Sequence, residues 1–321
     1  MPEVVEVCLT ALWLNDKIAG KQLTSITIMG GRYARHSLKG LIYVNKSKPF
    51  KINKIDSKGK FLWFELTGND NEKYYILNRF GLEGEWGFTQ QEHSGLQFTI
   101  TDNYGKEINL YFTDSRNFGT VEIVNNKKNL DDELRKMGPD LLKIPFTKQD
   151  FYKRLGDYVT RKTDNIVKAR GDKKIIKVLM NQTASGGIGC GLGNYLSVEI
   201  LYDCKISPHK TIREIYRDEQ LAYKLADSIK YVVKSSYLNA DIGYFEHLDK
   251  GMISFVDELR KEINENKNYI NNYHPDVILD KNTKFSFKVY RQKKDPYGNP
   301  IQADKIITGR TTYWSPTIQK L

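Results

Sequence analysis

The sequence contains few cysteines, the residues that form disulfides or ligate structural metals in small proteins, and it lacks long apolar runs. Its 321 residues contain three cysteines, Cys8, Cys190 and Cys204, which are too few and too scattered for a disulfide framework or a four-cysteine zinc site. We expect them to be small buried hydrophobic side chains. No stretch approaches 18 apolar residues, and the first turn carries Glu3 and Glu6 instead of a basic region before an apolar run. Neither secretion nor membrane insertion is indicated, so we expect a soluble intracellular protein.

The composition predicts a folded protein of two domains with a polyanionic partner. With 40% hydrophobic and 12% aromatic residues, the chain can bury ordinary cores and is not globally disordered. It has 50 lysine and arginine residues against 39 aspartate and glutamate residues, a formal net charge of +11 and a pI near 9.2. This balance favours nucleic acid over an acidic protein surface as the partner.

The first six residues admit a structural and a chemical interpretation. Proline suits the first turn of a helix, apolar residues recur at helical spacing up to Trp13, and Glu3 and Glu6 would complement the helix dipole. Removal of the initiator methionine would instead make Pro2 a secondary α-amine beside a carboxylate. The pKa of an α-amine is near 8, so about a tenth of it is neutral and nucleophilic at pH 7. Taken alone, the stretch favours a helix start.

The part of the chain that follows this helix has the pattern of antiparallel strands. β-Branched and aromatic residues, several in period-two alternation, mark seven segments. They are residues 23–29, 40–45, 60–66, 73–78, 96–101, 106–113 and 119–124. The sequence Asp-Asn-Tyr-Gly at residues 102–105 is a hairpin turn signal between two of them. We therefore expect an antiparallel β-sandwich.

Beyond Lys127 the periodicity becomes helical. Residues 147–150 resemble a capping box. Further helices are predicted over residues 174–182, 195–202, 211–238 and 253–265. A glycine-rich turn at residues 186–194 joins the first two, and the Asn-rich residues 264–272 are expected to be a polar connection. In the tail, alternation at residues 285–290, a turn at 295–300 and a return through 305–307 predict a small β-hairpin.

Taken in order, these stretches resemble the formamidopyrimidine-DNA glycosylase and endonuclease VIII family of base-excision repair enzymes, over nearly the whole chain. The matching segments are residues 2–7, similar to the family's Pro-Glu-x-Pro-Glu-Val opening with Val5 in place of its second proline; Gly59 and Lys60 before a strand; residues 79–82 and 114–119, which resemble two DNA-probing loops; Gln182 with residues 191–195, similar to the helix-two-turn-helix signature; and residues 309–314, similar to the arginine turn of the C-terminal finger. Individually most of these segments are weak signals, but their order and spacing together are specific.

The sequence departs from the family at the finger. Members usually carry two Cys-x-x-Cys pairs there, whereas here the first knuckle is shortened to residues 296–300, and Ser315 and Ile318 stand in the places of the second pair. These groups do not ligate zinc. The finger resembles the zincless finger of some eukaryotic and viral endonuclease VIII-like members, so we expect a retained DNA contact without a metal or other cofactor.

The resemblance implies an α+β protein of two domains. Its N-terminal part would be an antiparallel β-sandwich with an N-terminal helix, and its C-terminal part a helical domain with a helix-two-turn-helix motif and a zincless β-hairpin finger. The expected boundaries are 1–130 for the catalytic β-sandwich, 131–280 for the helical DNA-binding domain and 281–321 for the finger.

The resemblance also changes the standing of the N-terminal residues. In this family Pro2 would attack C1′ of the damaged nucleotide, expel the base and form a Schiff base, after which elimination cuts the strand. Glu3 would protonate the departing sugar oxygen and shuttle protons. Lys60, which on its own is an ordinary solvated charge, would contact the phosphate beside the lesion. Glu6 is open between substrate recognition and a structural role.

DNA contacts are implied at further positions. Asn194 either caps a helix, donates its amide to a phosphate, or does both, and Arg310 would grip the phosphates that flank an extruded nucleotide. Leu82, Arg116 and Phe118 match the positions that fill the gap left by that nucleotide. Leu82 and Phe118 are otherwise ordinary core candidates. Arg79 lies in the first probing loop. Asn117, where the bacterial 8-oxoguanine enzymes commonly have arginine, weakens any expectation of their opposite-base preference.

Two functions remain open at this point. The first is a monomeric bifunctional DNA glycosylase and abasic-site lyase, removing oxidised pyrimidines and ring-damaged purines by Schiff-base chemistry and β,δ-elimination. The second is a non-catalytic protein of the same fold that binds DNA lesions. Duplex DNA is the expected partner, with single-stranded DNA left open. The compartment would be the cytoplasm of a bacterium, the nucleus of a eukaryote, or that of a virus-encoded enzyme.

Overall fold

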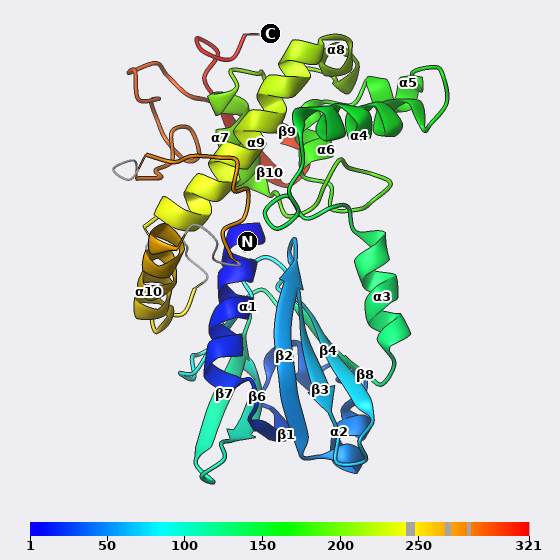
Figure 1. Ribbon diagram of the computed structural model, residues 1–321, viewed down its shortest axis with the longest axis vertical. Coiled ribbons are helices and arrows are strands. Elements are labelled where there is room, and N and C mark those ends of the chain that lie inside the picture. The colour runs from blue at the N-terminus through cyan, green and yellow to red at the C-terminus, as the bar shows by residue number, and fades with distance from the viewer. Residues whose placement is uncertain (242–247, 267–270, 281–283, 321) are drawn as a thin grey trace. The chain divides into compact units, whose positions relative to one another are not determined.

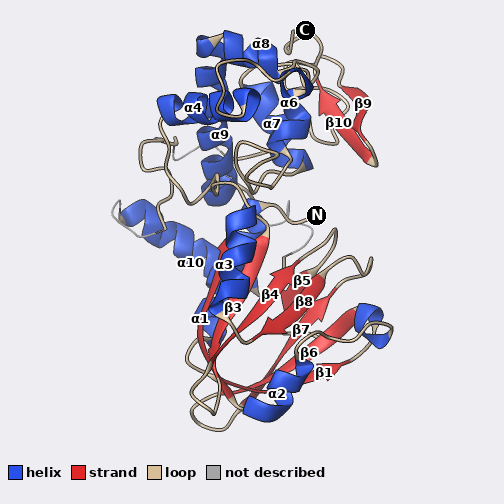
Figure 2. Cartoon of the chain, turned by 90° about the vertical axis from the view of Figure 1, so that its right-hand side faces the viewer, coloured by secondary structure: helices blue, strands red, loops and turns tan. Residues whose placement is uncertain are grey.

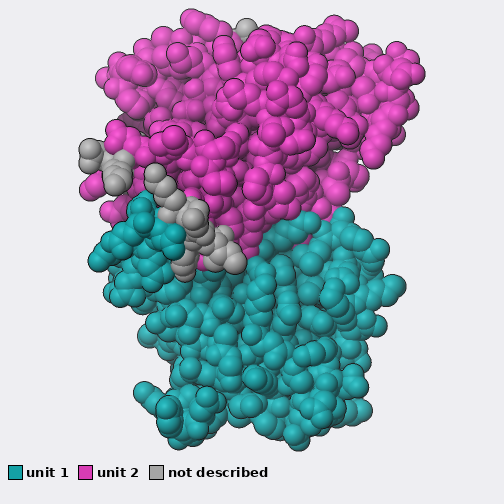
Figure 3. All heavy atoms as spheres, in the orientation of Figure 1, with its two compact units in different colours: residues 1–135, 242–266 teal, residues 136–241, 267–321 magenta. Residues whose placement is uncertain are grey.

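The computed structural model describes residues 1–241, 248–266, 271–280 and 284–320. The chain divides into two compact units, which Figure 3 shows in different colours. Unit 1 comprises residues 1–135 and 242–266, and unit 2 comprises residues 136–241 and 267–321. Residues 242–266, which the sequence analysis placed in its domain 131–280, thus group with the β-rich unit.

Unit 1 is built on one antiparallel sheet of eight strands in the order β5-β7-β6-β1-β2-β3-β4-β8. The strands are β1 (Gln22–Ile28), β2 (Phe50–Lys58), β3 (Phe61–Thr67), β4 (Lys73–Arg79), β5 (Glu85–Gly87), β6 (Ser94–Thr101), β7 (Glu107–Thr113) and β8 (Thr120–Val124). β1 pairs with β6 along its whole length but with β2 only at Gln22 and Leu23. The sheet can therefore fold over at that short junction.

Aromatic contacts show that the sheet does fold over into two layers. The ring of Phe64 on β3 lies 5.5 Å from the ring of Trp86 on β5 and 6.1 Å from that of Phe98 on β6, although these strands are far apart in the hydrogen-bonded order. The indole Nε1 of Trp86 also donates to Asn78 Oδ1 on β4 (3.1 Å). The expected antiparallel sandwich is confirmed, and its core is aromatic.

Helices cover the sheet of unit 1. They are α1 (Val4–Ile18), the 3₁₀ turn η1 (Gly31–Ala34), α2 (Leu41–Ser47), α3 (Lys127–Lys136) and α10 (Met252–Glu265). α1 packs on β2, β3 and α10, and Figures 1 and 2 show it running along the sheet. Asn15 Oδ1 fixes its position by accepting a hydrogen bond from the Ile55 amide (2.9 Å). The N-terminal helix is as expected.

Two segments of unit 1 differ from the sequence prediction. The strand expected at residues 40–45 is wrong, because they enter helix α2. In that helix only Val44 and Ser47 are buried, a three-residue spacing that fits a helix, and the β-branched Ile42 is 59% exposed. Strand β2 was also not among the segments predicted from the sequence. A register shift between Ile52 and Lys54 breaks the period-two alternation by which strands are recognised.

Unit 2 is helical with a terminal hairpin. Its helices are α4 (Lys148–Thr160), α5 (Lys168–Gly171), α6 (Ile175–Leu179), α7 (Asn194–Asp203), α8 (Ile212–Arg217) and α9 (Glu219–Asn239), and its strands are β9 (Gln302–Ile307) and β10 (Arg310–Trp314). α9 contacts α4, α7 and α8, and α7 contacts β10. The expected capping box is present, because Thr147 Oγ1 accepts from the Asp150 amide (3.0 Å). The polar connection expected at residues 264–272 lies partly outside the described residues.

The tail forms a hairpin, but not from the segment that the alternation indicated. β9 pairs with β10 across a turn at Gly309, whereas the strand expected at residues 285–290 is wrong. The buried carboxylate of Glu199 accepts hydrogen bonds from the amides of Lys288, Val289 and Tyr290 (2.9, 2.9 and 2.8 Å). Three consecutive amides that converge on one carboxylate are unavailable for a strand ladder, and alternation alone cannot reveal such a competitor.

The three cysteines are buried, as the sequence analysis expected. Burial raises the pKa of the Cys204 thiol to about 12, which removes it as a nucleophile at neutral pH. Among the described residues, no helix combines the length and apolarity needed to cross a membrane.

The aromatic junction between the two layers should dominate the stability of unit 1. Phe64→Ala removes a side chain that is 1% exposed, and we expect it to lower the free energy of unfolding by about 3–5 kcal/mol. Tyr104→Ala is the control, because that ring is 96% exposed at a hairpin turn and its loss should cost less than about 0.5 kcal/mol. Denaturant unfolding measures both, and equal losses would contradict the assigned core.

Candidate functional site

The N-terminal residues form the buried start of α1. Pro2 is buried, and Glu3 and Glu6 are 2% and 4% exposed. Glu3 is the N-cap, and its amide donates to Glu6 Oε2 (3.1 Å) in a capping-box arrangement. The structural interpretation of this stretch therefore holds. It is compatible with the chemical one, because a rigid first turn fixes the α-amine of residue 2 next to a carboxylate.

Lys60 lies in a two-residue turn between β2 and β3. Lys58 pairs with Phe61 across this turn, and Gly59 has φ +56°, a conformation that glycine adopts without strain. Figure 1 shows α1 starting at the same end of unit 1 at which β2 ends. The helix start with Pro2 and Glu3 and the turn with Lys60 thus occupy one end of this unit.

The two expected probing loops lie against each other. A Cβ on Gly81 would come within 2.5 Å of the Gly119 nitrogen, so only glycine permits this approach. The second loop is shaped by Asp114, whose carboxylate accepts from the amides of Arg116 (3.1 Å) and Gly119 (2.5 Å). The structure thus brings residues 79–82 and 114–119 together within unit 1.

The side chains of these loops differ in exposure. Phe118 is 57% exposed, which removes the core alternative for it, whereas Leu82 is half-buried. Arg116 Nη1 lies 3.6 Å from Glu83 Oε1, so a phosphate or base would have to replace an existing ion pair. Arg79, at the end of β4, pairs with Glu133 and lies 3.9 Å from Glu122.

In unit 2 the glycine-rich turn presents Asn194 to the hairpin. Gln182 holds the turn by donating to Leu192 O (2.8 Å) and accepting from the Gly191 amide (2.6 Å). The N-cap of α7 is Gly193, so Asn194 does not cap that helix. Its amide nitrogen donates instead to Thr311 O (2.9 Å), the residue after Arg310. The structure therefore brings Asn194 next to the arginine turn of β10.

The hairpin is fastened by a carboxylate that the sequence analysis did not identify. Asp295 is 5% exposed. Its Oδ1 accepts from the amides of Tyr297 (3.0 Å) and Asn299 (2.9 Å), and its Oδ2 accepts from Ser315 Oγ (2.9 Å). Ser315 thus ties residues 295–299 to the end of β10. Among the described residues no group of three or more potential ligands is placed to hold a metal ion.

A second polar cluster positions β9. His209 Nε2 lies 2.7 Å from Asp304 Oδ2, to which Trp314 Nε1 also donates (2.9 Å), and Lys174 Nζ is 3.1 Å from His209 Nδ1. Asp304 stands opposite Thr312 in the hairpin. The sequence contains no motif for this cluster, because its residues are scattered along the chain and 95 positions separate His209 from Asp304.

Comparison with known proteins shows the family. The N-terminal domain model of formamidopyrimidine-DNA glycosylase matches residues 1–121, and its C-terminal domain model matches residues 275–320, together more than half of the chain. The formamidopyrimidine-DNA glycosylase of Lactococcus lactis subsp. lactis is 28% identical over 243 residues, covering 74% of this chain and 78% of that protein. The one of Prochlorococcus marinus is 25% identical over 335 residues and covers both chains fully.

Solved structures show the same fold. A Lactococcus lactis enzyme bound non-covalently to DNA with an abasic site has a TM-score of 0.65 at 22% identity, covering 99% of this chain and 100% of that one. A second complex of the Lactococcus lactis enzyme with abasic-site DNA has a TM-score of 0.68 at 22% identity and the same coverage. The matches define a DNA glycosylase of base excision repair, of a class that also cleaves abasic sites. The chain belongs to the formamidopyrimidine-DNA glycosylase family.

The hydrogen bonds that the Asp295 carboxylate accepts in the hairpin predict that this part of the structure is destabilised by acid. Burial alone would raise the pKa of Asp295, but hydrogen bonds from Asn299, Ser315 and Tyr297 outweigh it and hold the pKa below its usual value. The stabilisation is therefore complete above the unfolded pKa of about 3.9 and is lost as pH falls through the lower folded value. We expect the amides of Tyr297 and Asn299 to lose hydrogen-exchange protection below about pH 4.

Asp295→Asn should remove this protection already at neutral pH, by at least about tenfold, because each hydrogen bond to a charged group contributes about 1.5–3 kcal/mol. Asp164→Asn, an exposed carboxylate of the same unit, is the matched control and should change nothing. Unaltered protection in Asp295→Asn would contradict the fastener.

Proposed function

We propose that this chain is a bifunctional glycosylase and abasic-site lyase that uses Pro2 as its nucleophile. The observation that carries the proposal is the buried start of α1, where residue 2 precedes two carboxylates that are almost fully buried. After removal of Met1, the neutral amine of Pro2 would attack C1′ of the damaged nucleotide. The bond from C1′ to the base breaks as the bond to nitrogen forms, and a Schiff base results.

Glu3 acts as the general acid and proton shuttle in this proposal. It would deliver a proton to the sugar ring oxygen as the ring opens, and loss of a proton from C2′ then allows β-elimination of the 3′ phosphate. A second, δ-elimination releases the 5′ phosphate. Glu6, which accepts the Glu3 amide, holds the backbone of this acid, and we assign it a positioning role.

Binding of the damaged DNA is assigned to residues of both units. Lys60 contacts the phosphate beside the lesion, and Asn194 and Arg310 contact flanking phosphates. The hydrogen bond from Asn194 to Thr311 supports their joint action. Leu82, Arg116 and Phe118 fill the space of the extruded nucleotide, with Arg79 beside them; the proximity of the two loops supports this role. The DNA complexes of the Lactococcus lactis enzyme support damaged DNA as the partner.

The C-terminal finger supports a more specific proposal about the class of damaged bases that the enzyme removes. A hairpin held by Asp295 and Ser315, instead of four cysteines, supports an endonuclease VIII-like member with a zincless finger. We therefore propose oxidised pyrimidines and ring-damaged purines as substrates. A panel of defined lesions in single- and double-stranded oligonucleotides tests this assignment, and excision of 8-oxoguanine alone would contradict it.

The nucleophile is tested by trapping. Incubation with abasic-site or thymine-glycol DNA and borohydride should give a covalent complex, because borohydride reduces the Schiff base. Protein that retains Met1 should give none, since its residue 2 has no free amine. Pro2→Gly should impair base excision. Absence of a trapped complex with correctly processed wild type would leave the non-catalytic lesion-binding protein as the function.

The acid is tested by Glu3→Gln, which should reduce base excision by about 10²–10⁴-fold with DNA affinity retained. Glu6→Gln disturbs the same helix start and separates the two roles: if it costs as much as Glu3→Gln, the geometry of the helix start and not proton transfer is at issue. Glu107→Gln, an exposed carboxylate on β7, is the neutral control.

A further inference from the structure

Unit 1 contains a basic cavity, and of its lining residues only Arg79 has a role in the function proposed above. It encloses about 630 Å³ between the segment of residues 32–39 and strands β4 and β8, within the range of sites for small ligands. Its basic lining residues are Arg32, Arg35, His36, Lys39 and Arg79, and its single carboxylate is Glu122. Permanent positive charges thus outnumber negative ones by four to one, which makes the cavity an anion site.

The charges of the cavity are incompletely neutralised. Arg79 pairs with Glu133, and Glu122 lies 3.9 Å from Arg79 and 4.0 Å from Lys39, so Glu122 is shared between two long contacts. Within the described part of the chain, no carboxylate is within ion-pair distance of Arg35 or His36. Arg32 Nη1 donates only to a neutral backbone oxygen, Asn117 O, at 3.5 Å. The guanidinium groups of Arg32 and Arg35 and the ring of His36 are therefore available to an incoming anion.

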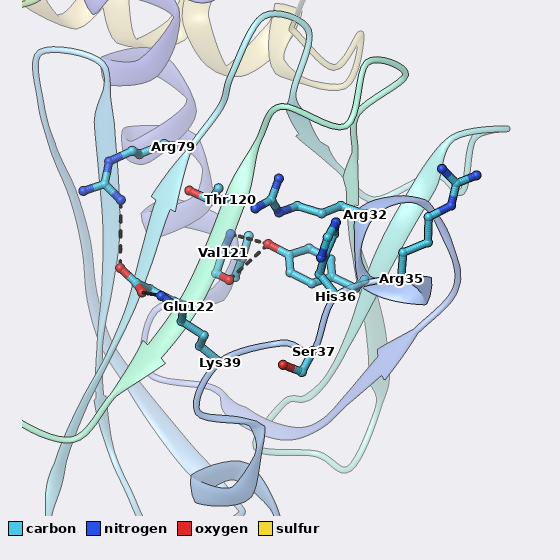
Figure 4. A pocket seen from close by; sticks show the side chains of 10 residues that line it. Arg32, Arg35, His36, Ser37, Lys39, Arg79, Thr120, Val121 and Glu122 are labelled. Carbon is cyan, nitrogen blue, oxygen red and sulfur yellow. Dashed lines mark hydrogen bonds and ion pairs between the residues drawn. The ribbon is translucent and has the colours of Figure 1, made fainter.

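The basic segment is pre-organised. The hydroxyl of Tyr33, 8% exposed, donates to Val121 O (3.0 Å) and accepts from the Val121 amide, and the Ile123 amide donates to Lys39 O (2.9 Å). Both ends of the segment are thus tied to β8. Gly40 permits the second tie, because a Cβ there would lie 2.0 Å from Ile123 O. Figure 4 shows Arg32 and His36 in front of β8 and Arg79 on its other side.

The surroundings of the cavity indicate which anion it takes. Arg32 contacts Asn117 of the second probing loop, and Arg79 pairs with Thr120 on one side and with Phe61, the neighbour of Lys60, on the other. Two strand spacings, about 10 Å, therefore separate the β8 wall from the strand that begins beside Lys60. A DNA strand that is bound at Lys60 can therefore reach the cavity within a few nucleotides.

We propose that this cavity binds a backbone phosphate of the DNA, other than the phosphate assigned to Lys60. The inference rests on the proposed function, since it takes the damaged DNA as the ligand. It adds a contact outside the lesion, and such a contact contributes affinity and register without reading sequence.

Salt dependence of binding tests this contact. We expect Arg32→Gln combined with Arg35→Gln to reduce the slope of log Kd against log salt by about 1 on a long lesion-containing duplex, because one phosphate contact contributes about 0.9. The same measurement is made on two shorter duplexes, each truncated close to the lesion on one side. The difference in slope between variant and wild type should disappear with one of these duplexes and persist with the other. The unfolding temperature shows that the variant is folded.

Lys51→Gln combined with Lys73→Gln is the matched control. Both lysines are exposed, and Lys73 lies at the opposite end of β4 from Arg79. An equal loss of slope in this control would reduce the effect to net charge and overturn the inference, as would an unchanged slope in the Arg32 and Arg35 variant. If inorganic phosphate alone raises the unfolding temperature of the wild type but not of that variant, the cavity is a site for a small free anion and the DNA assignment fails.

Borohydride trapping at saturating protein and low salt keeps the two proposals apart. If the wild type traps DNA but has the same salt slope as the variant, the proposed function stands and the proposed phosphate site in the cavity is wrong. Wild type that traps nothing loses the proposed function whatever its slope.

Discussion

Buried carboxylates that accept hydrogen bonds from backbone amides hold four segments of this chain at the ends of, or outside, its regular secondary structure. Glu6 fixes the start of α1, Asp114 shapes the second probing loop, Glu199 gathers three amides before the finger, and Asp295 closes the knuckle. All four side chains are buried. A buried carboxylate is costly unless it is hydrogen-bonded, so each one imposes a single backbone geometry on the segment around it. The candidate functional residues lie on or beside these segments.

The sequence predicted the elements whose pattern is local and missed those decided by tertiary contacts. Alternation identified β3, β4, β6, β7 and β8, and helical spacing identified α1, α7, α9 and α10. Strand β2 was not recognised because a bulge at residues 52–54 interrupts its alternation. Residues 40–45 were predicted as a strand, but they enter helix α2, in which only two positions are buried. Glu199 accepts hydrogen bonds from the amides of residues 288–290, about ninety positions further along the chain. Local periodicity in the sequence cannot reveal a contact over such a separation. The competing force in each case is a contact with another element.

The candidate site divides in the same way. Pro2, Glu3 and Lys60 could be named because their motifs are contiguous, and the resemblance gave them roles that composition could not. The approach of residues 79–82 to residues 114–119 through Gly81, and the link from Asn194 to Thr311, needed the fold. Asp295, Asp304 and the residues of the basic cavity carry no motif. They become recognisable only when their partners, distant in sequence, are seen beside them.

The hairpin fastened by Asp295 and Ser315 has a chemical consequence. Cysteine thiolates that ligate a metal are oxidised by the same reagents that damage DNA bases, whereas a carboxylate and a hydroxyl are inert to them. In the finger of this chain, a hydrogen bond from Ser315 to Asp295 joins residues 295–299 to the end of β10, and the proposed DNA contact Arg310 lies in the same hairpin. This joint is therefore weakened by acid but is insensitive to oxidants, so the arginine turn would keep its geometry under the oxidising conditions that create the proposed substrates.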